Sequence, residues 1–471
     1  MTTAVPGAGI MGAAVVRNWL KVRAAKLQVN DGSTITVRWK NDDKSEKSGS
    51  TAPGFGELPA QPPIARRRLL IVGGAAAAAL AGCGGPTRRL PLPGAASPSA
   101  GSTAWSIPVS LPEPWATPPV TRYDAGLRAA VSRYLRPTPE HPAHPLYPGA
   151  VAFAAVDGRV AAHFAVGDAV RYAADRTELP AAERVQARPD TVYDLASLTK
   201  VFTAVLALRL VERGRLDLDA PASRYLPSFA GKRGITVQML FTHTSGLSKD
   251  TPLAGGSPAD RLEHVLREPP VAAPGSGFLY ADQNFIALGA IVAELTGERL
   301  DTLVRTEIAA PLGMADTGYL PPREMLPRIA ATEGPLRGAV HDPAAAAFGG
   351  VSGHAGLFGT AADLGLFGRA LLSGGGPLLR PETVERMRAN ANARFGPSAQ
   401  HGLGVDVDQP WYMGRLAGHG AFGHTGFTGT SIVLEPRRKV VLVLLTNRVH
   451  PDAAWGGNNA ARKAAADVLA G

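Results

Sequence analysis

The chain has a single cysteine, Cys83, among its 471 residues, and several widespread enzyme motifs are missing from it. One cysteine excludes an intrachain disulfide framework and a zinc site built from cysteines. The sequence contains no Gly-x-Ser-x-Gly elbow, no His-Glu-x-x-His pair and no Walker-type phosphate loop. It also shows no repeat with a solenoid-like period. The chemistry must therefore be sought in other patterns.

Most of the chain also lacks an excess of positive charge, although the formal net charge is +10. Residues 1–90 carry 13 Lys and Arg against 5 Asp and Glu, whereas the remaining residues carry 36 against 34. A nucleic-acid-binding domain usually has a basic surface, so we expect no nucleic-acid partner. Because 45% of the residues are hydrophobic, the chain can bury a large core.

The first 121 residues divide into three segments that precede the main domain. We interpret residues 1–63 as a disordered extension or the result of a misplaced start codon, with Met11–Val29 as a short helix and Thr34–Trp39 as a short strand. Residues 64–83 are predicted to be a lipoprotein signal. Residues 84–121 form a linker with nine prolines between positions 84 and 120, which predicts a semi-extended tether.

A basic stretch and a short apolar run define the signal. Arg66-Arg67-Arg68 precedes the run Leu69–Ala79, which is too short to span a bilayer unaided. Leu80-Ala-Gly-Cys83 follows at once and resembles the bacterial lipobox. That resemblance implies lipidation of Cys83, anchoring to the cell membrane and an extracytoplasmic location. A buried structural cysteine after an Ala-rich helix is the alternative interpretation.

Residues 122–471 are predicted to fold with an α+β layout, in which helix and strands come first, a helical region follows, and strands and a helix close the chain. The strands around Asp157-Gly158 are typical of a β-hairpin with a tight turn. Residues 215–400 read mostly as helices separated by Gly/Pro-rich loops. The other expected elements are the helix Tyr123–Leu135, the hairpin strands Gly149–Val156 and Arg159–Val166, the late strands Gly429–Glu435 and Val440–Thr446, and the helix Ala454–Leu469.

The sequence contains one Ser-x-x-Lys, formed by Ser197 and Lys200 just before a run, Val201–Arg213, that predicts a helix ending at Gly214. Residues three apart on a helix lie on one face, so the serine oxygen would lie beside the lysine nitrogen. A serine needs such a neighbouring base to act as a nucleophile, and the helix N-terminus favours developing negative charge. A surface Ser and Lys at the start of a helix is the alternative.

Two further motifs follow in order: Tyr280-Ala-Asp282, and His424-Thr425-Gly426 at the opening of a predicted strand. With these motifs, and with the stretches 235–247, 348–360 and 423–429, the chain resembles the class C-like serine hydrolases of the β-lactamase and penicillin-binding-protein superfamily. The resemblance covers roughly residues 122–471. It implies a β-lactamase/transpeptidase-like fold, with an antiparallel sheet flanked by helices and a mostly helical subdomain.

The resemblance also implies roles for individual residues. Ser197 would attack a carbonyl to give an acyl-enzyme, and Lys200 and Tyr280 would share proton transfer; which of the two takes the first proton stays open. The backbone N–H groups of Ser197 and Phe427 would form the oxyanion hole. No cofactor and no metal are expected. The implied substrate-binding residues are Asp282, His424, Thr425 and Gly426.

Two of these residues depart from the β-lactamase pattern. Many relatives have Asn in place of Asp282, and an ionised carboxylate cannot donate a hydrogen bond to a substrate carbonyl. His424 stands where many β-lactamases have Lys. His-Thr-Gly is more typical of the peptidases and esterases of the family. Asp282 could instead cap the following helix, and His424 could be structural. Asn447 and Arg448 are further candidates for binding a substrate carboxylate. Three residues are expected to be satisfied within their loops rather than to line the pocket: His341, Asp342 and His354.

We therefore expect an extracytoplasmic, lipid-anchored serine hydrolase that cleaves D-amino-acid peptides of the cell wall as a D-alanyl-D-alanine carboxypeptidase. The expected partners are a peptidoglycan-derived peptide or a small ester or amide, and the membrane through the lipid anchor. A carboxylesterase and a weak β-lactamase are alternatives within the family, because pocket loops set the substrate. A non-catalytic wall-binding lipoprotein is the alternative from another class, although the intact Ser197, Lys200 and Tyr280 argue against it.

Overall fold

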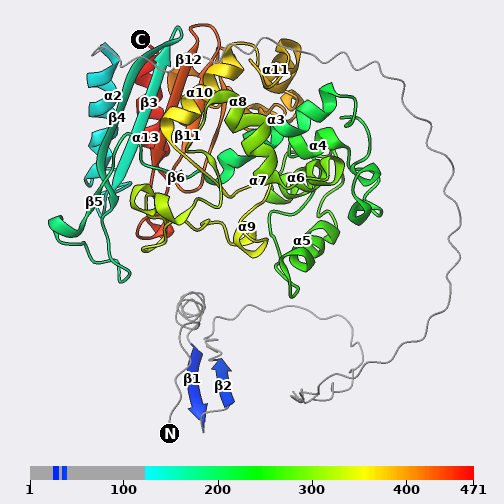
Figure 1. Cartoon of the computed structure of the whole chain (residues 1–471), viewed down its shortest axis with the longest axis horizontal. Helices are drawn as coiled ribbons and strands as arrows, with labels where there is room; N and C mark the ends of the chain where they lie inside the picture. The colour runs from blue at the N-terminus through cyan, green and yellow to red at the C-terminus, as the bar shows by residue number, and fades with distance from the viewer. Residues whose placement is uncertain (1–24, 31–33, 40–121) are drawn as a thin grey trace, which may run out of the picture. The chain divides into compact units, whose positions relative to one another are not determined.

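The computed structural model describes residues 25–30, 34–39 and 122–471 of the chain (Figure 1). Ala25–Asn30 (β1) and Thr34–Trp39 (β2) pair as an antiparallel hairpin. The strand predicted at Thr34–Trp39 is confirmed. The helix predicted over Met11–Val29 is wrong at residues 25–29, because the backbone there is extended and pairs with β2.

Several predictions for the first part of the chain fall on residues that the structure does not describe. They are the beginning of the Met11–Val29 helix, the signal at 64–83 with its lipidation residue Cys83, and the Pro-rich linker at 84–121. These remain predictions. Among the described residues, none of the helices is both long enough and apolar enough to span a bilayer.

A seven-stranded antiparallel sheet runs through residues 122–471, in the order β5-β4-β3-β12-β11-β10-β9 (Figure 1). The predicted hairpin is confirmed as β3 and β4, and its turn residues Asp157 and Gly158 both have positive φ, as a tight hairpin turn requires. Strand β3 also pairs with β12, so an early and a late segment of the chain meet in mid-sheet. The strands are β3 (Gly149–Val156), β4 (Arg159–Val170), β5 (Val185–Gln186), β9 (Asp406–Val407), β10 (Phe422–Thr425), β11 (Ser431–Glu435) and β12 (Val440–Thr446).

Helices cover both faces of this sheet, which explains why its central strands are hydrophobic at nearly every position. Successive side chains of a strand point to opposite faces. In β3, the alanines at 150, 152 and 154 belong to one core and Val151, Phe153 and Ala155 to the other. Helices α2 (Arg122–Ser132) and α13 (Asn459–Leu469) pack on the first face, and α10 (Ala361–Leu372) packs on the second.

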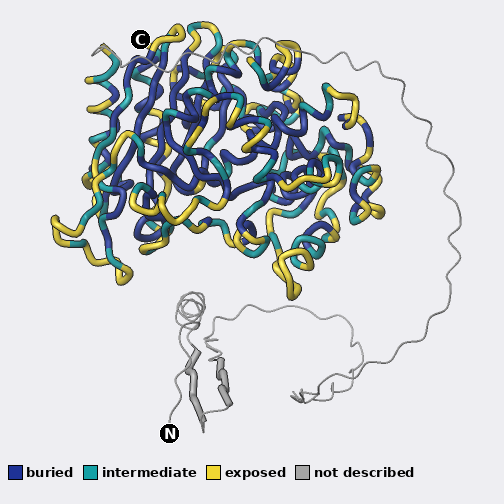
Figure 2. The backbone as a smooth tube through the Cα atoms, viewed as in Figure 1, coloured by how far each residue is buried: buried dark blue, intermediate teal, exposed yellow. Residues whose placement is uncertain are grey.

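The second core continues into a mostly helical region, drawn in green in Figure 1. Its central helix is α3 (Thr199–Glu212), which packs against α6 (Asp282–Thr296) and is buried on nearly all sides (Figure 2). A small antiparallel sheet, β6-β8-β7, lies beside the start of α3. The remaining elements are α4 (Val237–Phe241), α5 (Pro258–Arg267), α7 (Leu300–Val304), α8 (Ala310–Leu312), α9 (Pro343–Ala347), α11 (Pro381–Arg388), α12 (Pro410–Met413), β6 (Tyr193–Asp194), β7 (Gly318–Tyr319) and β8 (Leu357–Gly359).

This architecture confirms the predicted α+β class, with an antiparallel sheet flanked by helices and a mostly helical region. Some predicted boundaries are wrong. His424-Thr425-Gly426 ends strand β10 instead of opening a strand, because the N–H of Gly426 donates to the carbonyl of Thr430 and closes a turn between β10 and β11. For the same reason β11 begins at Ser431 and not at Gly429. The last helix begins at Asn459, after a short 3₁₀ turn at Ala453–Trp455.

Candidate active site

Ser197 and Lys200 are neighbours at the start of α3. Ser197 lies in a 3₁₀ turn, Ala196–Leu198, that leads directly into the helix, and Lys200 is the second residue of α3. The Nζ atom of Lys200 lies 2.9 Å from the Oγ atom of Ser197. Lys200 is fully buried, whereas Ser197 is partly exposed within an otherwise buried segment. The nucleophile candidate thus lies at the edge of the buried segment, while its lysine partner is shielded from water.

The 3₁₀ turn Ala196–Leu198, called the nucleophile turn below, begins with a strained residue and is held in place by hydrogen bonds. Ala196 has φ +47°, which is unfavourable for a residue with a Cβ. The buried carboxylate of Asp194 accepts hydrogen bonds from the N–H groups of Ala196 (2.9 Å) and His341 (2.7 Å). The hydroxyls of Thr428 and Thr430 donate to two main-chain carbonyls of the same segment, at 2.7 and 3.0 Å. Burial raises the pKa of Asp194 to about 6, although both N–H donors oppose this shift.

The ammonium group of Lys200 faces a carboxylate. Its Nζ lies 2.7 Å from Oδ1 of Asp282 and 3.2 Å from the carbonyl oxygen of His354. Burial lowers the pKa of Lys200, but Asp282 and Tyr280 outweigh burial and bring the pKa above its ordinary value. Burial likewise raises the pKa of Asp282, but Lys200 outweighs it and the pKa falls below its usual range. The resting site therefore holds an ammonium–carboxylate pair.

Tyr280, in the loop before α6, lies beside Ser197 and Lys200. Its hydroxyl lies close enough to Ser197 and Lys200 for both residues to lower its pKa. Burial raises the pKa of Tyr280, partly offset by Lys200, so the phenol is neutral at neutral pH. The ring of His243 lies 4.4 Å from the ring of Tyr280, and Nδ1 of His243 accepts the N–H of Ala281 at 3.2 Å. His243, which is buried and hydrogen-bonded to the backbone, therefore packs against one side of the Tyr280 ring.

Asp282 does not cap α6. It is the first residue of the helix, and Ala281, which has no polar side chain, occupies the N-cap position. The capping alternative is therefore wrong, because the carboxylate of Asp282 points to Lys200 instead of to the N–H groups of its own helix. The sequence alone did not show that Asp282 keeps Lys200 positively charged.

The His424-Thr425-Gly426 strand end lies against the nucleophile turn. His424 is buried, burial lowers its pKa to about 4, and its Nε2 finds no hydrogen-bond partner among the described residues. Thr425 is partly exposed, whereas Gly426 is buried. A Cβ at Gly426 would lie 2.1 Å from Oγ1 of Thr430 and 2.6 Å from the carbonyl oxygen of Leu195. Only glycine therefore allows the two turns to approach so closely.

Phe427 follows this glycine and is 56% exposed, which is unusual for a large apolar side chain. Its ring lies between two polar side chains: the guanidinium carbon of Arg448 is 4.2 Å from the ring centroid, and the His341 ring is stacked at 5.7 Å. The side chain thus forms an apolar surface beside the nucleophile turn, while its backbone belongs to the turn between β10 and β11.

Asn447 and Arg448, proposed from the sequence to bind a substrate carboxylate, are engaged elsewhere. The side chain of Asn447 is buried and bonded to the backbone of Gly149, Asp168 and Ala169. Arg448 donates from Nε to the carbonyl of Phe427 at 2.6 Å, and from Nη1 to two carbonyls of the loop before α13. These contacts give both residues a role in holding the backbone, and the carboxylate prediction is wrong for Asn447.

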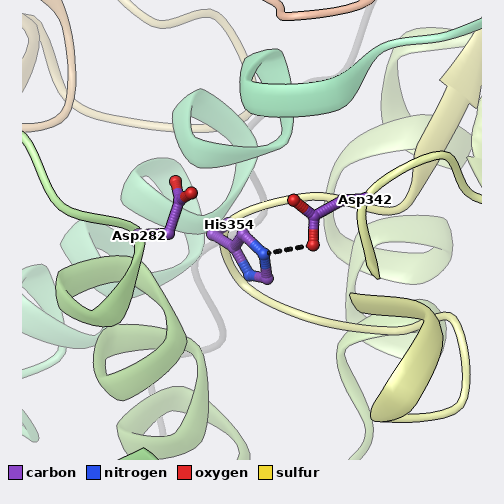
Figure 3. Close-up of side chains that lie close together, drawn as sticks. All are labelled: Asp282, Asp342 and His354. Carbon is purple, nitrogen blue, oxygen red and sulfur yellow. Dashed lines mark hydrogen bonds and ion pairs between the residues drawn. The ribbon is translucent and has the colours of Figure 1, made fainter. Parts of the chain in front are cut away.

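His354 and Asp342 form a pair next to Lys200 (Figure 3). The Nε2 atom of His354 lies 2.9 Å from Oδ1 of Asp342, and its Nδ1 lies 2.8 Å from the Ser352 hydroxyl. Asp342 also accepts the N–H of Ala345 as the N-cap of α9. As predicted, the side chains of His354 and Asp342 are satisfied within their loop. His341 pairs with Glu333 at 3.2 Å, again as a loop residue would.

Side-chain donor atoms of Asp282, Asp342 and His354 lie within 4.8 Å of one another, as a metal site would require (Figure 3). Both ring nitrogens of His354 are already engaged, however, and the ammonium of Lys200 lies against Asp282. A lysine cation in this position already supplies the positive charge that a metal would bring. We therefore interpret Asp282, Asp342 and His354 as polar groups that surround Lys200, and not as a metal site.

The sequence reasoning missed Arg462, a buried arginine on α13 whose Nη2 atom contacts the turn after β10. A signal for it exists: it lies on the helix next to the small apolar residues Ala461, Ala465 and Ala466, which are all fully buried. A charged residue in such an apolar stripe is unusual and indicates a specific partner.

A serine oxygen 2.9 Å from a buried lysine nitrogen, with a tyrosine side chain beside them, defines a serine hydrolase. The family model described as Beta-lactamase matches residues 139–467, so the chain belongs to the β-lactamase family. This result and the fold together confirm the resemblance stated from the motifs.

Similar proteins agree with this assignment. A protein of Escherichia coli (strain K12) named "Putative D-alanyl-D-alanine carboxypeptidase" is 33% identical over an alignment of 316 residues, with 57% of this chain and 72% of that protein covered. Among solved structures, a hydrolase with promiscuous acyltransferase activity, EstCE1, has a TM-score of 0.59 at 22% identity and covers 74% of this chain and 98% of its own. A penicillin-binding-protein homologue from Caulobacter crescentus has a TM-score of 0.58 at 24% identity, with 75% and 99% covered. These two structures support the fold alone.

Proposed function

We propose that this serine hydrolase is a D-alanyl-D-alanine carboxypeptidase-like enzyme that acylates Ser197. The observation that carries the proposal is the contact of Lys200 Nζ with Ser197 Oγ at 2.9 Å, with the Tyr280 side chain beside both. The substrate class is supported by the name of the 33% identical relative. The fold by itself does not select a substrate.

In the proposed reaction, the Oγ atom of Ser197 forms a bond to the substrate carbonyl carbon and the bond to the leaving amine breaks. The serine proton passes through Tyr280 to the leaving nitrogen. Tyr280 suits this task because its hydroxyl lies close to the nucleophile, while the nearby ammonium of Lys200 stabilises negative charge on its oxygen. Water then attacks the acyl-enzyme, releases the acid and returns a proton to Ser197.

The backbone N–H groups of Ser197 and Phe427 are the proposed oxyanion hole. Such donors are effective because they are fixed before charge develops on the substrate oxygen, and removing one typically costs about 2.7–4 kcal/mol of barrier stabilisation. The close approach of Gly426 to the Leu195 carbonyl brings the two turns that carry these N–H groups together. In this arrangement Thr425 and Gly426, at the end of β10, face the bound substrate. His424 and Asp282 lie behind the groups that contact the substrate.

A carboxylesterase is the second candidate, and one feature favours it. A carboxypeptidase must bind a free carboxylate, yet Asn447 and Arg448 hold backbone groups. The exposed ring of Phe427 instead offers an apolar surface beside the nucleophile turn, which suits an uncharged acyl or alkyl group.

Exposure of the purified chain to benzylpenicillin, followed by intact mass measurement, tests these alternatives. A lasting adduct that maps to Ser197 and is missing in Ser197→Ala would support the penicillin-sensitive peptidase. Unmodified protein with unchanged drug would favour the esterase, to be tested with short-chain esters. Unmodified protein with hydrolysed drug would indicate a β-lactamase, so the drug is assayed in the same tube. An active Ser197→Ala variant would contradict the nucleophile assignment.

We also propose that the enzyme is extracytoplasmic and anchored to the cell membrane by lipidated Cys83. The support is the order of the Arg66-Arg67-Arg68 stretch, the apolar run and Leu80-Ala-Gly-Cys83 in the sequence. The Pro-rich segment at 84–121 would then separate the catalytic domain from the membrane surface.

A further inference from the structure

The peptide group that joins Gly426 to Phe427 has a buried cation on its carbonyl side. The Nη2 atom of Arg462 donates to the carbonyl oxygen of Gly426 at 2.7 Å and to that of Thr430 at 2.8 Å. Arg462 comes from α13, is only 6% exposed and is fixed further by a 2.8 Å bond from Nη1 to Asn459. The closing helix thus reaches the turn after β10 through one side chain.

The N–H of this same peptide group is that of Phe427. In a trans peptide the C=O and N–H bonds are coplanar and point in opposite directions. A group that fixes the carbonyl of Gly426 therefore also fixes the direction of the Phe427 N–H. If the peptide turned over, the N–H would leave the oxyanion hole and a carbonyl oxygen would face the developing negative charge.

The surroundings of the turn strengthen this argument. Arg448 donates to the carbonyl of Phe427 at 2.6 Å, so the next peptide group is held by a second arginine. The N–H of Gly429 donates to the same Gly426 carbonyl at 3.0 Å. The hydrogen-bond acceptors that Arg462 contacts are all neutral, and burying a cation is costly even with the attraction of the Asp406 carboxylate. The charge of Arg462 lies at the carbonyl end of the peptide dipole, where it strengthens the N–H as a donor.

We propose that Arg462 is a positioning residue for the oxyanion hole, which orients and polarises the Gly426–Phe427 peptide from the side opposite the substrate. This inference rests on the proposed function, because it takes the Phe427 N–H as an oxyanion donor. It assigns the residue an effect on the transition state and little effect on the binding of the uncharged ground state.

The test compares Arg462→Gln and Arg462→Lys with the unchanged chain and with Lys463→Gln. Lys463 is the next residue of α13, and its ammonium pairs with Asp467 at the surface, 2.7 Å away. Three quantities are measured: kcat and KM for p-nitrophenyl acetate, and the inhibition constant of phenylboronic acid. The boronic acid becomes tetrahedral on the serine and places an oxygen in the oxyanion hole.

For Arg462→Gln we expect kcat to fall about 10- to 100-fold, less than the loss of a whole oxyanion donor, with KM within about twofold. The boronate inhibition constant should rise by a similar factor. Arg462→Lys should recover part of the loss, because an ammonium can still donate to one of the two carbonyls. Lys463→Gln should match the unchanged chain in all three quantities.

An unchanged kcat and inhibition constant in folded Arg462→Gln would overturn the proposal and leave Arg462 with a purely structural role. If that variant does not fold, Asn459→Ala is measured instead, since it keeps the guanidinium but removes one of its anchors. For Asn459→Ala, a fall in kcat smaller than that expected for Arg462→Gln, with a matching rise in the boronate inhibition constant, would support the proposal. No change in either quantity would overturn it. Failure of the proposed function is recognised separately, by an unchanged chain without esterase activity or by an active Ser197→Ala variant.

Discussion

The carboxylate of Asp282 lies 2.7 Å from the ammonium of Lys200, so the residue beside the nucleophile is held in its charged form. The motif resemblance places Asn at this position in many relatives. A neutral amide would leave burial as the dominant influence on Lys200 and lower its pKa. Asp282 therefore sets the protonation state of Lys200 in the resting site of this chain.

Asp282→Asn should move the pH dependence of acylation to lower pH. In the proposed reaction Lys200 acts as an ammonium. Asp282 raises the pKa of Lys200, and removing the carboxylate lets burial lower that pKa, so acylation should be lost at a pH about one to three units lower. Single-turnover acylation rates measured between pH 5 and 10 would show this. Asp301→Asn, which alters a surface carboxylate 2.9 Å from Arg299, is the matched control. An unmoved profile would mean that the charge of Lys200 does not control acylation.

Gly426→Ala should inactivate the enzyme. The new Cβ would lie 2.1 Å from Thr430 and 2.6 Å from the Leu195 carbonyl, so the turn that carries the Phe427 N–H must move away from Ser197. A displacement of about 1 Å can cost about 100-fold in rate, and we expect kcat to fall by at least that factor. Gly457→Ala, where a Cβ meets nothing within 4 Å, should leave kcat unchanged. Near-normal activity of Gly426→Ala would show that the turn can rearrange without loss.

Asp194 should make folding stability depend on pH. Its pKa is about 6 in the folded protein, above the ordinary 3.8, so the folded state binds the proton more tightly. This contribution to stability is fully present below about pH 4 and is lost as the pH rises through about 6. The stability of the unchanged chain relative to Asp194→Asn should fall by on the order of 3 kcal/mol across this window.

Urea unfolding of both proteins at several pH values between 4 and 7.5 measures this difference. Asp363, whose pKa burial also raises to about 6, is present in both proteins and cancels in the comparison. A stability difference between the two proteins that stays constant with pH would show that folding does not raise the pKa of Asp194.

Cys83→Ser should release the protein from membranes. Thioether attachment of lipid requires the cysteine sulfur, and the variant keeps the rest of the signal. Membrane and soluble fractions of cells that express the full chain are compared by immunoblotting, with the catalytically altered Ser197→Ala as a control that should remain in the membrane fraction. Continued sedimentation of Cys83→Ser with membranes would show that the lipobox interpretation is wrong.

Much of the fold and the centre of the site could be predicted because their signals are local. Ser197 and Lys200 are three residues apart in one helical turn, and Asp157-Gly158 marks a hairpin within its own sequence. The contact between Asp282 and Lys200 could not be predicted in this way, because it joins two helices that are far apart in the chain. Propensity and spacing carry no information about which distant side chains meet.

The same limit explains the remaining differences. Arg448 looked available for a substrate because it follows a strand, yet the carbonyls that bind it belong to two separate loops. His424-Thr425-Gly426 was placed at the opening of a strand because the hydrophobic residues that follow are in β11. The turn that separates them is closed by a hydrogen bond from Gly426 to Thr430, which the hydrophobic pattern does not reveal.

The pairing of β3 with β12 has a consequence for how the chain is made. Ala150 pairs with Thr446 and Ala155 with Val441, so the middle of the sheet joins segments roughly 290 residues apart. A ribosome must therefore synthesise nearly all of the domain before its sheet can close, and loop closure over such a separation slows folding. The sheet of the nascent chain should therefore stay open until late in synthesis, with the apolar faces of β3 and β4 uncovered until β12 arrives.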